Sequence, residues 1–241
     1  MYDLHSHVLP GIDDGAQSID DTVALLKAAV DDGISHLIAT PHIQLGRFDN
    51  TLSNIAAIHQ QVIDHEQVVS LPIKLAFAAE IRICPEIMLL AKQQALPLLG
   101  QWHGHSVMLL ELPHSHIPAG TEQLIKWLIN QSIIPLIAHP ERNRDIQADY
   151  QKFKRLAKTG CLFQLTASSI TGDFGEHAQS IAEQIIKDNK AAIVASDMHS
   201  MKRRPPKMSQ AYQSVSSLFG EEVANLLFVT NPQLIAESMF T

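Results

Sequence analysis

Short apolar segments alternate with amphipathic segments along the whole chain. Seven of the apolar segments are hydrophobic over several consecutive residues, and they span residues 2–7, 36–42, 73–81, 106–113, 134–141, 161–169 and 191–199. Strands that are buried on both faces of a parallel sheet have this continuous pattern, whereas half-exposed strands alternate between apolar and polar residues. The pattern therefore predicts seven buried, parallel strands.

The stretches between these strands have the periodicity of helices with one apolar face. In the first stretch, SIDDTVALLKAAVDDG, Ser18 and Asp21 have the spacing of a capping box, and Gly33 ends the helix. The stretches TEQLIKWLINQS, DYQKFKRLAKTG and EHAQSIAEQIIKDN show the same pattern. Strand–helix units that recur about every 30 to 35 residues predict βα repeats with right-handed connections.

Seven βα units fit an α/β barrel of seven strands, or an irregular version of the eight-stranded barrel. A doubly wound open sheet is the alternative, because the spacing of the units does not distinguish an open sheet from a closed one. No linker divides the chain, so we expect residues 1–241 to form a single domain. A length of 241 residues is usual for one barrel domain.

Composition narrows the class of protein. The chain is 46% hydrophobic and carries 18 basic against 25 acidic residues, for a formal charge of −7. This balance argues against nucleic acid as a partner, because binding to a phosphate backbone requires a basic surface. No apolar run reaches the roughly 18 to 20 residues of a membrane helix, and the polar start argues against a signal peptide. Cys84 and Cys161 fit reduced thiols, so we expect a cytoplasmic protein without membrane insertion.

Ionisable residues recur at one place in this pattern, the C-terminal end of the predicted strands. Six of the seven strands end in a histidine, an aspartate or a glutamate, namely His5, His7, His42, Glu80, Glu111, His139, Asp197 and His199. Active sites are built at this edge in barrels and in doubly wound sheets alike. One such residue is usually an ordinary loop residue, but that explanation predicts scatter along the chain, and these residues are not scattered.

Imidazole and carboxylate groups that converge beside buried strands need a partner, because burial of unpaired charge is costly. A cluster of metal ions is such a partner, and a ligand set without cysteine suits Mn, Fe, Mg or Zn. His5 and His7 stand two residues apart on one strand, so both rings point to the same face and can reach one ion. We expect one of Asp13 and Asp14, in the nearby DDG turn, to join them.

Other histidines are expected to lie outside this cluster. The HGH segment at 103–105 precedes its strand and should lie at the opposite end of the barrel. The HSH segment at 114–116 follows a strand on the correct side, and we place it at the substrate entrance. His36, His59, His65 and His177 are interpreted as solvated.

Five short motifs stand at these strand ends, namely DLHSH at the start, TPH (40–42), AEI (79–81), AHPER (138–142) and ASDMH (195–199). Together they resemble the PHP superfamily of polymerases and histidinol phosphatases. The segments GIDDGAQS, RICPEI and RRPP (203–206) are similar to the manganese-dependent protein-tyrosine phosphatases of bacterial capsule and exopolysaccharide systems, the CpsB/CapC type. The resemblance covers essentially the whole chain.

The resemblance implies a distorted (β/α)7 barrel and three divalent metal ions, Mn2+ first, with Fe, Zn or Mg as alternatives. The metal ligands that it implies are His5, His7, Asp14, His42, Glu80, Glu111, His139, Asp197 and His199, so it favours Asp14 over Asp13. It also implies that Arg142 and Arg204 bind the substrate phosphate. Asp173, in the segment TGDFG, departs from the basic or neutral residue expected there, which argues against a phosphate-binding role for that loop.

This ligand set suits a phosphate ester as substrate. Its four carboxylates and five neutral histidines carry about −4 and three divalent ions +6, so the site would have a charge of about +2. One guanidinium group can donate two parallel hydrogen bonds to a phosphate, whereas the ammonium group of lysine cannot. Asp197 and His199 are candidate proton donors, although a tyrosyl leaving group, with an ordinary pKa of about 10, needs little acid assistance. The implied substrate is a phosphotyrosine-containing protein, a bacterial tyrosine kinase that controls polysaccharide export.

Other functions stay open at this stage. The first alternative is a PHP phosphatase of small metabolites such as histidinol phosphate, which needs the same metals. The second is a PHP nuclease, which the acidic net charge disfavours. The third is a non-catalytic domain, in which some of the metal ligands would be lost. A cysteine-dependent tyrosine phosphatase is excluded, because it needs an arginine six residues after the cysteine. Leu90 and Ala167 occupy those positions after Cys84 and Cys161. The exposed helix faces are compatible with an oligomer, so the oligomeric state stays undecided.

Overall fold

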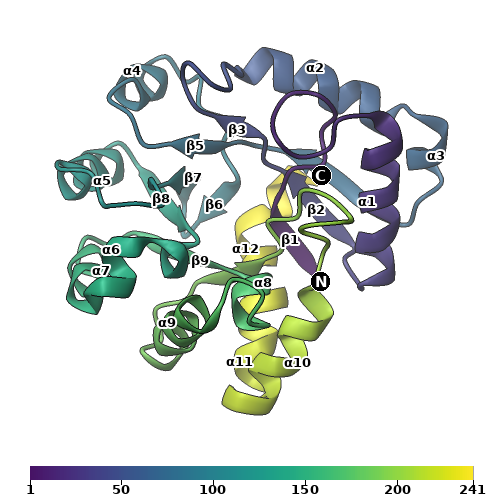
Figure 1. The fold of residues 1–241 in the computed structure, drawn as a ribbon. Helices are drawn as coiled ribbons and strands as arrows, with labels where there is room; N and C mark the ends of the chain where they lie inside the picture. Colours follow the sequence, from purple (N-terminus) through teal and green to yellow (C-terminus); the bar gives the residue numbers. More distant parts are fainter. Residues whose placement is uncertain (241) are drawn as a thin grey trace.

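The computed structural model describes residues 1–240, and in it helices surround a ring of strands (Figure 1). The strands are β1 (Tyr2–Ser6), β2 (His36–Ala39), β3 (His42–Ile43), β4 (Lys74–Phe77), β5 (Glu80–Arg82), β6 (Gly100–Trp102), β7 (His105–Glu111), β8 (Ile133–Ala138), β9 (Leu162–Thr166) and β10 (Ile193–Ala195). The α-helices are α1 (Ile19–Asp31), α2 (Leu52–Ile63), α3 (Glu66–Val69), α4 (Ile87–Lys92), α5 (Thr121–Asn130), α6 (Arg144–Ala148), α7 (Tyr150–Ala157), α8 (Ala167–Ile170), α9 (Glu176–Lys187), α10 (Met208–Phe219), α11 (Glu221–Asn225) and α12 (Asn231–Ala236). Two 3-10 turns, η1 (Pro140–Arg142) and η3 (Glu237–Met239), and a π-helical turn, η2 (Leu226–Thr230), complete the described elements.

The strands pair in parallel around a distorted ring. Regular pairing runs β1–β2–β4 in one sheet and β3–β5–β7–β8–β9–β10 in the other. The two sheets are continuous because β2 leads into β3 and β4 into β5, with a hydrogen bond from the amide of Ala78 to the carbonyl of Ala39 (2.8 Å) at the break. The ring closes where the amide of Asp197 donates to the carbonyl of His5 and that of His7 donates to Met198, both at 2.9 Å.

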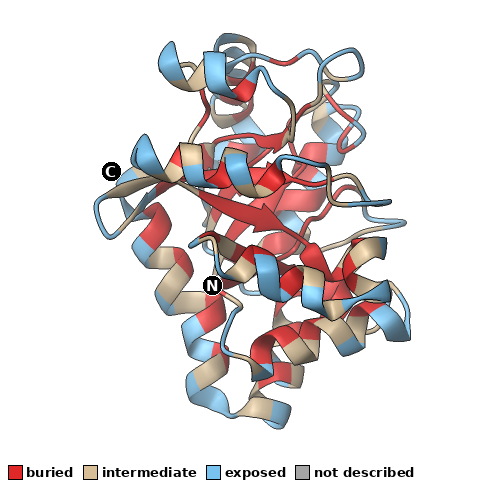
Figure 2. Cartoon of the chain, turned by 90° about the vertical axis from the view of Figure 1, so that its left-hand side faces the viewer, coloured by how far each residue is buried: buried red, intermediate tan, exposed pale blue. Residues whose placement is uncertain are grey.

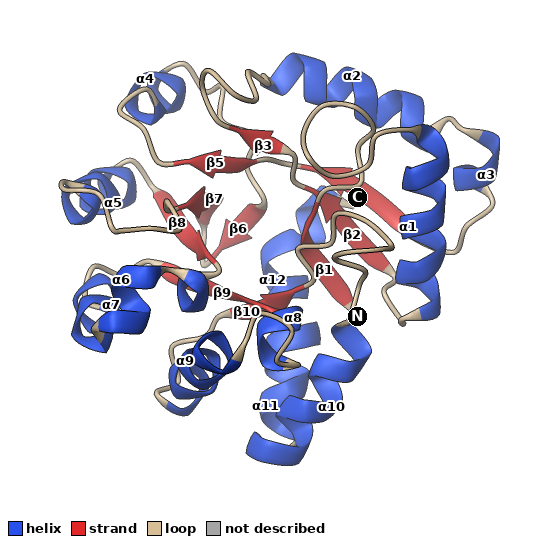
Figure 3. Ribbon diagram, viewed as in Figure 1, coloured by secondary structure: helices blue, strands red, loops and turns tan. Residues whose placement is uncertain are grey.

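The predicted elements are present. Counting β2 with β3 and β4 with β5, seven parallel strands cover the seven apolar segments, and the predicted distorted barrel is confirmed over the open sheet. Helix α1 begins with the capping box of Ser18 and Asp21 and ends before Gly33, which has φ +85°. Helices α5, α7 and α9 lie in the three other predicted stretches. Figure 3 shows the helices spaced around the outside of the strands.

Strand β6 was not predicted, and it explains the HGH segment. β6 pairs antiparallel with β7, and the tight turn between them contains His103 and Gly104, with φ +49° and +83°. This turn lies at the start of β7, whereas Glu111 lies at its end. The prediction that HGH sits at the opposite end of the barrel is confirmed.

One of the four remaining histidines is buried. His59, on α2, is only 9% exposed, and its ring packs against Phe77 with 5.0 Å between the ring centroids. Its position on the apolar side of an amphipathic helix causes the burial, and burial lowers its pKa. The expectation of a solvated His59 is therefore wrong, although the residue takes no part in the cluster at the strand ends.

The barrel interior changes from apolar to ionisable along the strands. Towards one end, Leu4, Leu109 and Leu136 pack with Ile235 of α12 in a separate apolar cluster. Alternate residues of a strand share a face, so Glu80, two residues after Ala78, and Glu111, two after Leu109, continue the same interior face. Figure 2 shows the central strands buried and the outer helices exposed on their outward sides. The polar side chains of the interior thus lie at the C-terminal edge of the strands, above an apolar floor.

No helix among residues 1–240 is both long and apolar enough to span a bilayer.

The packing of α12 against β6 predicts a specific sensitivity to substitution. A Cβ atom at Gly100 would lie 2.0 Å from the carbonyl oxygen of Ile235, and the backbone there has φ +124°. Gly104, in the same hairpin, also has a positive φ (+83°) but has no atom within 4 Å of its Cβ position. We expect Gly100→Ala to lower the free energy of unfolding by about 3 kcal/mol and Gly104→Ala by about 1 kcal/mol. Denaturant unfolding measures both, and equal losses would show that the contact with α12 is unimportant.

Candidate metal centre

The nine residues proposed as ligands come together at the C-terminal edge of the strands. Most are almost completely buried, with exposures of 0% for His5, His7 and Glu80, 1% for Asp197, 3% for Glu111, 4% for His199 and 6% for His139. His42 is partly buried, and Asp14 lies at the rim with 42% of its side chain exposed. The structure therefore brings every one of these residues to one place, although they span nearly the whole sequence.

Ligand atoms of these residues form four overlapping groups, each with all its atoms within 4.8 Å of one another. The groups are His7, Asp14, His42 and His199; His5, His7 and Glu80; His5, His139 and Asp197; and His42, Glu80 and Glu111. Shared members such as His5, His7 and Glu80 place the groups side by side. The cluster therefore offers more than one group of ligand atoms that could hold a metal ion.

The described residues satisfy the buried polar atoms of the cluster poorly. Nε2 of His199 has no hydrogen-bond partner among them, and Nδ1 of His42 and Oε2 of Glu80 meet each other at 2.9 Å. In addition, the Nε2 atoms of His5 and His7 face each other at 3.2 Å. Buried polar atoms without partners are rare in folded proteins and costly. A divalent ion ligated by these atoms removes the cost, so the residues fit metal ions.

A second layer of side chains orients the histidines. Nδ1 of His5 contacts Oε1 of Gln164 at 2.8 Å, and Nδ1 of His7 contacts Oδ2 of Asp13 at 2.7 Å. Bonds of this kind at Nδ1 leave Nε2 free to bind a metal. Asp13 also accepts the amides of Gly15 and His42. Of the two aspartates in the DDG turn, Asp13 thus supports His7, and Asp14 belongs to a ligand group.

Sequence reasoning missed Gln164 and Arg82. Gln164 is uncharged and lies within β9, the one strand without an ionisable residue at its end. Arg82 donates to both carboxylate oxygens of Glu111, with Nε–Oε2 at 2.8 Å and Nη2–Oε1 at 2.9 Å. The signal for Arg82 is its position two residues after Glu80 on β5, which places both side chains on one face.

The two proposed phosphate-binding arginines lie beside the cluster. Nη1 of Arg142 is 2.5 Å and Nη1 of Arg204 is 2.8 Å from Oδ2 of Asp197. Arg142 follows β8 in η1, and Arg204 lies in the segment after β10. Both side chains are partly buried, at 11% and 24% exposure. The structure therefore places two guanidinium groups next to one candidate ligand.

The protonation states of several residues suit metal binding. Burial lowers the pKa of His139 to about 3, with a further contribution from Arg142, so its imidazole is neutral. Burial raises the pKa of Glu80, but the neighbouring His5 and His42 outweigh it, and the pKa lies well below its ordinary value. For His42, burial lowers the pKa, but the negative charge of Glu80 outweighs this effect and raises the pKa to about 9. A divalent ion would replace that proton, since only the neutral imidazole is a ligand.

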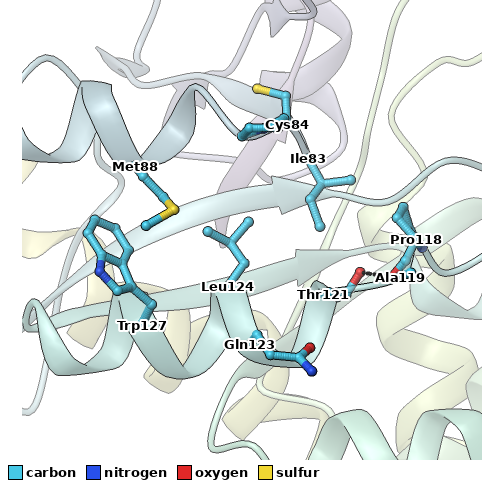
Figure 4. Close-up of a pocket in the computed structure, with 11 residues that line it drawn as sticks. Ile83, Cys84, Met88, Pro118, Ala119, Thr121, Gln123, Leu124 and Trp127 are labelled. Atoms are coloured by element: carbon cyan, nitrogen blue, oxygen red, sulfur yellow. Dashed lines mark hydrogen bonds between the residues drawn. The ribbon is translucent and has the colours of Figure 1, made fainter.

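An apolar cavity of about 450 Å³ lies apart from this cluster, between α4 and α5 (Figure 4). Met88 of α4 and Trp127 of α5 line it, and none of the nine candidate ligands does. Cys84 also lines this cavity, and burial raises the pKa of its thiol. Burial raises the pKa of the Cys161 thiol to about 11. Neither cysteine is an activated nucleophile, in agreement with the sequence.

A parallel strand ring with histidines and carboxylates at its C-terminal edge defines the class of barrel proteins whose active site is a metal cluster at that edge. Several solved barrels share the fold alone. One is the phosphotriesterase homology protein of Escherichia coli, with a TM-score of 0.58 and 10% identity over 97% of this chain and 98% of that one.

Residues 1–237 match the family described as capsular polysaccharide synthesis, CpsB/CapC, and the chain belongs to that family. Tyrosine-protein phosphatase YwqE of Bacillus subtilis is 34% identical over 228 residues, which are 94% of this chain and 88% of YwqE. Tyrosine-protein phosphatase CpsB of Streptococcus pneumoniae is 27% identical over 241 residues, 98% of each chain. Crystal structures of YwqE from Bacillus subtilis and CpsB from Streptococcus pneumoniae are described together as those of metal-dependent tyrosine phosphatases. A chain from this pair matches the present structure with a TM-score of 0.91 and 31% identity over 99% of this chain and 95% of that one. The resemblance seen in the sequence is confirmed.

The role of Asp13 is testable without an activity assay. Asp13→Asn keeps the size of the side chain but removes the negative charge behind His7, so the histidine loses its orientation and basicity. We expect divalent-metal affinity, measured by calorimetry on chelator-stripped protein, to fall about 10- to 100-fold. Asp20→Asn, in the exposed first turn of α1, is the control and should leave the affinity unchanged. An unaltered affinity in Asp13→Asn would exclude a supporting role.

Proposed function

We propose that this chain is a metal-dependent tyrosine-protein phosphatase that acts on a tyrosine kinase of a capsule or exopolysaccharide system. The observation that carries the proposal is the convergence of the buried ligand groups with two arginines at Asp197. The relatives that are named tyrosine-protein phosphatases support the reaction, and the capsule family supports the biological setting. Together they favour phosphotyrosine on a protein over a small phosphate ester.

The proposed cofactor is three Mn2+ ions. Nine side chains provide about three protein ligands for each ion, a number that leaves a position open for water or substrate. Imidazole and carboxylate ligands without thiolate suit Mn2+, with Fe, Zn or Mg as alternatives. When bound, such ions would lower the pKa of a water molecule towards about 7 and supply positive charge for the phosphoryl oxygens.

The chain's own residues bind and orient the phosphate. Arg142 and Arg204 present fixed N–H donors at the edge of the cluster, and a phosphate dianion accepts pairs of such bonds. In this structure, Asp197 accepts one hydrogen bond from each guanidinium group. Both guanidinium groups therefore face the ligand cluster in the absence of substrate. The arginines therefore hold the phosphorus next to the ligand groups instead of at the rim of the barrel.

Asp197 and His199 are assigned here as ligands and not as proton donors. Burial raises the pKa of Asp197, but His5 and Arg204 outweigh it and keep the carboxyl ionised. Burial, aided by the charge of His7, lowers the pKa of His199 to about 2, so its imidazole is neutral, and it donates its remaining proton from Nδ1 to the carbonyl of Asp197 at 2.9 Å. A tyrosyl leaving group needs little acid assistance, because its ordinary pKa is about 10.

The reaction is tested by initial rates on chelator-stripped protein to which Mn2+ is returned. We expect Mn2+-dependent hydrolysis of a phosphotyrosyl peptide, a much lower rate with histidinol phosphate, and no turnover by the His5→Ala, His7→Ala double variant. Metal content is measured alongside and should approach three ions per chain. A preference for histidinol phosphate would contradict the assignment of substrate. No turnover of either compound by metal-loaded protein would contradict a phosphatase function.

The role of the arginines is tested separately. Arg142→Met and Arg204→Met each remove a charged donor pair, so we expect kcat/KM for the phosphotyrosyl peptide to fall about 100-fold. Arg144→Met is the matched control, because Arg144 is exposed and its side chain contacts none of the ligand residues. A loss in the control as large as in the two variants would show that the effect comes from the charge of the protein rather than from phosphate contact.

A further inference from the structure

The loop at residues 171–175, TGDFG, lies beside the proposed phosphate site and has no role in the function described so far. It connects α8 to α9. Its backbone is tied by the amide of Asp173 to the carbonyl of Ser168 at 2.9 Å and by the amide of Gly175 to that of Gly172 at 3.0 Å. Asp173 is an unexpected residue in this place, since a carboxylate repels a phosphate.

The ring of Phe174 packs against the guanidinium of Arg142, whose Cζ is 4.3 Å from the ring centroid. Two other groups contact the edges of the same guanidinium. Nη1 donates to Asp197, and Nη2 is 3.1 Å from Nε2 of His114, which must accept because arginine has no acceptor. A phosphate binds at the edges of a guanidinium, whereas Phe174 covers a face. The contact with Phe174 can therefore persist while phosphate is bound.

Asp173 connects the loop to the segment that carries the other arginine, Arg204. Its Oδ1 is 2.6 Å from Nζ of Lys207, and the hydroxyl of Thr171 donates to its Oδ2. Lys207 is three residues after Arg204 and is the N-cap residue of α10. The amide of Met208 donates to Asp32 at 2.6 Å, which attaches the start of α10 to the end of α1. The ion pair thus joins the loop that carries Phe174 to a segment that is itself held in place.

We propose that the 171–175 loop is a positioning element for phosphate binding, in which Phe174 holds Arg142 and the Asp173–Lys207 ion pair links the loop to the segment of Arg204. This inference rests on the proposed function, because it concerns the same two arginines. It also explains Asp173: the carboxylate is neutralised by Lys207 and acts on phosphate only through Phe174 and Arg142. Phe174, Asp173 and Lys207 are positioning residues and not catalytic ones.

The contact with Phe174 is tested by steady-state kinetics with the Mn2+-loaded enzyme and a phosphotyrosyl peptide, and with inorganic phosphate as inhibitor. Phe174→Leu keeps an apolar side chain but removes the aromatic face. We expect KM and the inhibition constant of phosphate each to rise about five-fold, a typical worth of a cation–π contact, with a smaller change in kcat. Phe174→Tyr retains the face and should restore both constants.

The ion pair is tested by reversal of its charges. Asp173→Asn and Lys207→Met should each raise the inhibition constant of phosphate about two- to five-fold, and the double variant Asp173→Lys, Lys207→Asp should recover most of the loss. Lys152→Met is the matched control, because Lys152 pairs with Asp145 at the same 2.6 Å and with similar exposure, but neither residue contacts Arg142 or Arg204. It should leave both constants unchanged.

The outcomes separate this inference from the proposed function. Wild-type enzyme without phosphotyrosine hydrolysis would contradict the proposed function itself. An active wild type with Phe174→Leu and Lys207→Met indistinguishable from Lys152→Met would overturn the positioning role alone. Metal content and thermal unfolding are measured for every variant. A fall in kcat that follows lost metal or lost stability, with the phosphate constant unchanged, would likewise overturn it.

Discussion

Burial of imidazole and carboxylate groups at the mouth of the barrel is the constraint on which the rest of the structure depends. Seven of the nine candidate ligands are at most 6% exposed, and Nε2 of His199 has no hydrogen-bond partner among residues 1–240. Such groups cannot be left in an apolar interior without a counter-charge, because their desolvation costs more than a domain of this size can offset. Metal ions would satisfy the lone pairs and the charge together, so the cluster and its proposed cofactors form one physical unit.

The barrel provides the positions that this unit requires. Parallel strands end at one edge, and alternate residues of each strand face the interior, so Glu80 and Glu111 continue the same face as the apolar residues Ala78 and Leu109. The apolar residues below them, packed against α12, exclude water from the floor of the site. Above that floor, Asp13, Gln164 and Arg82 hold the ligands from outside the cluster. A ligand set drawn from six strands is therefore rigid without a disulfide or a long linker.

In the proposed function, the loops around the mouth provide the side chains that bind the substrate phosphate. Arg142 and Arg204 belong to different βα connections, yet both donate to Asp197. The 171–175 loop comes from a third connection and packs Phe174 on Arg142. The proposed substrate binding thus depends on several loops at once, as in other barrels, whereas most of the candidate metal ligands lie at the strand ends.

Much of this protein is determined by local sequence. Continuous apolar runs identify the seven strands, the Ser18 capping box identifies the start of α1, and ionisable residues after six of the runs identify the ligand edge. These signals are short-range, since burial on both faces of a strand and the spacing of a cap leave their mark within a few residues. Tertiary structure alone decided the other parts. The role of Asp13 behind His7, of Gln164 behind His5 and of Arg82 on Glu111 depends on atoms that meet across as many as 159 residues of chain. Two other misses are local: β6 is only three residues long and joins β7 through a tight turn, and His59 lies on the apolar side of α2. The link from Asp173 to Lys207 was invisible because it joins two segments distant in the chain, and no pattern within one segment records its partner.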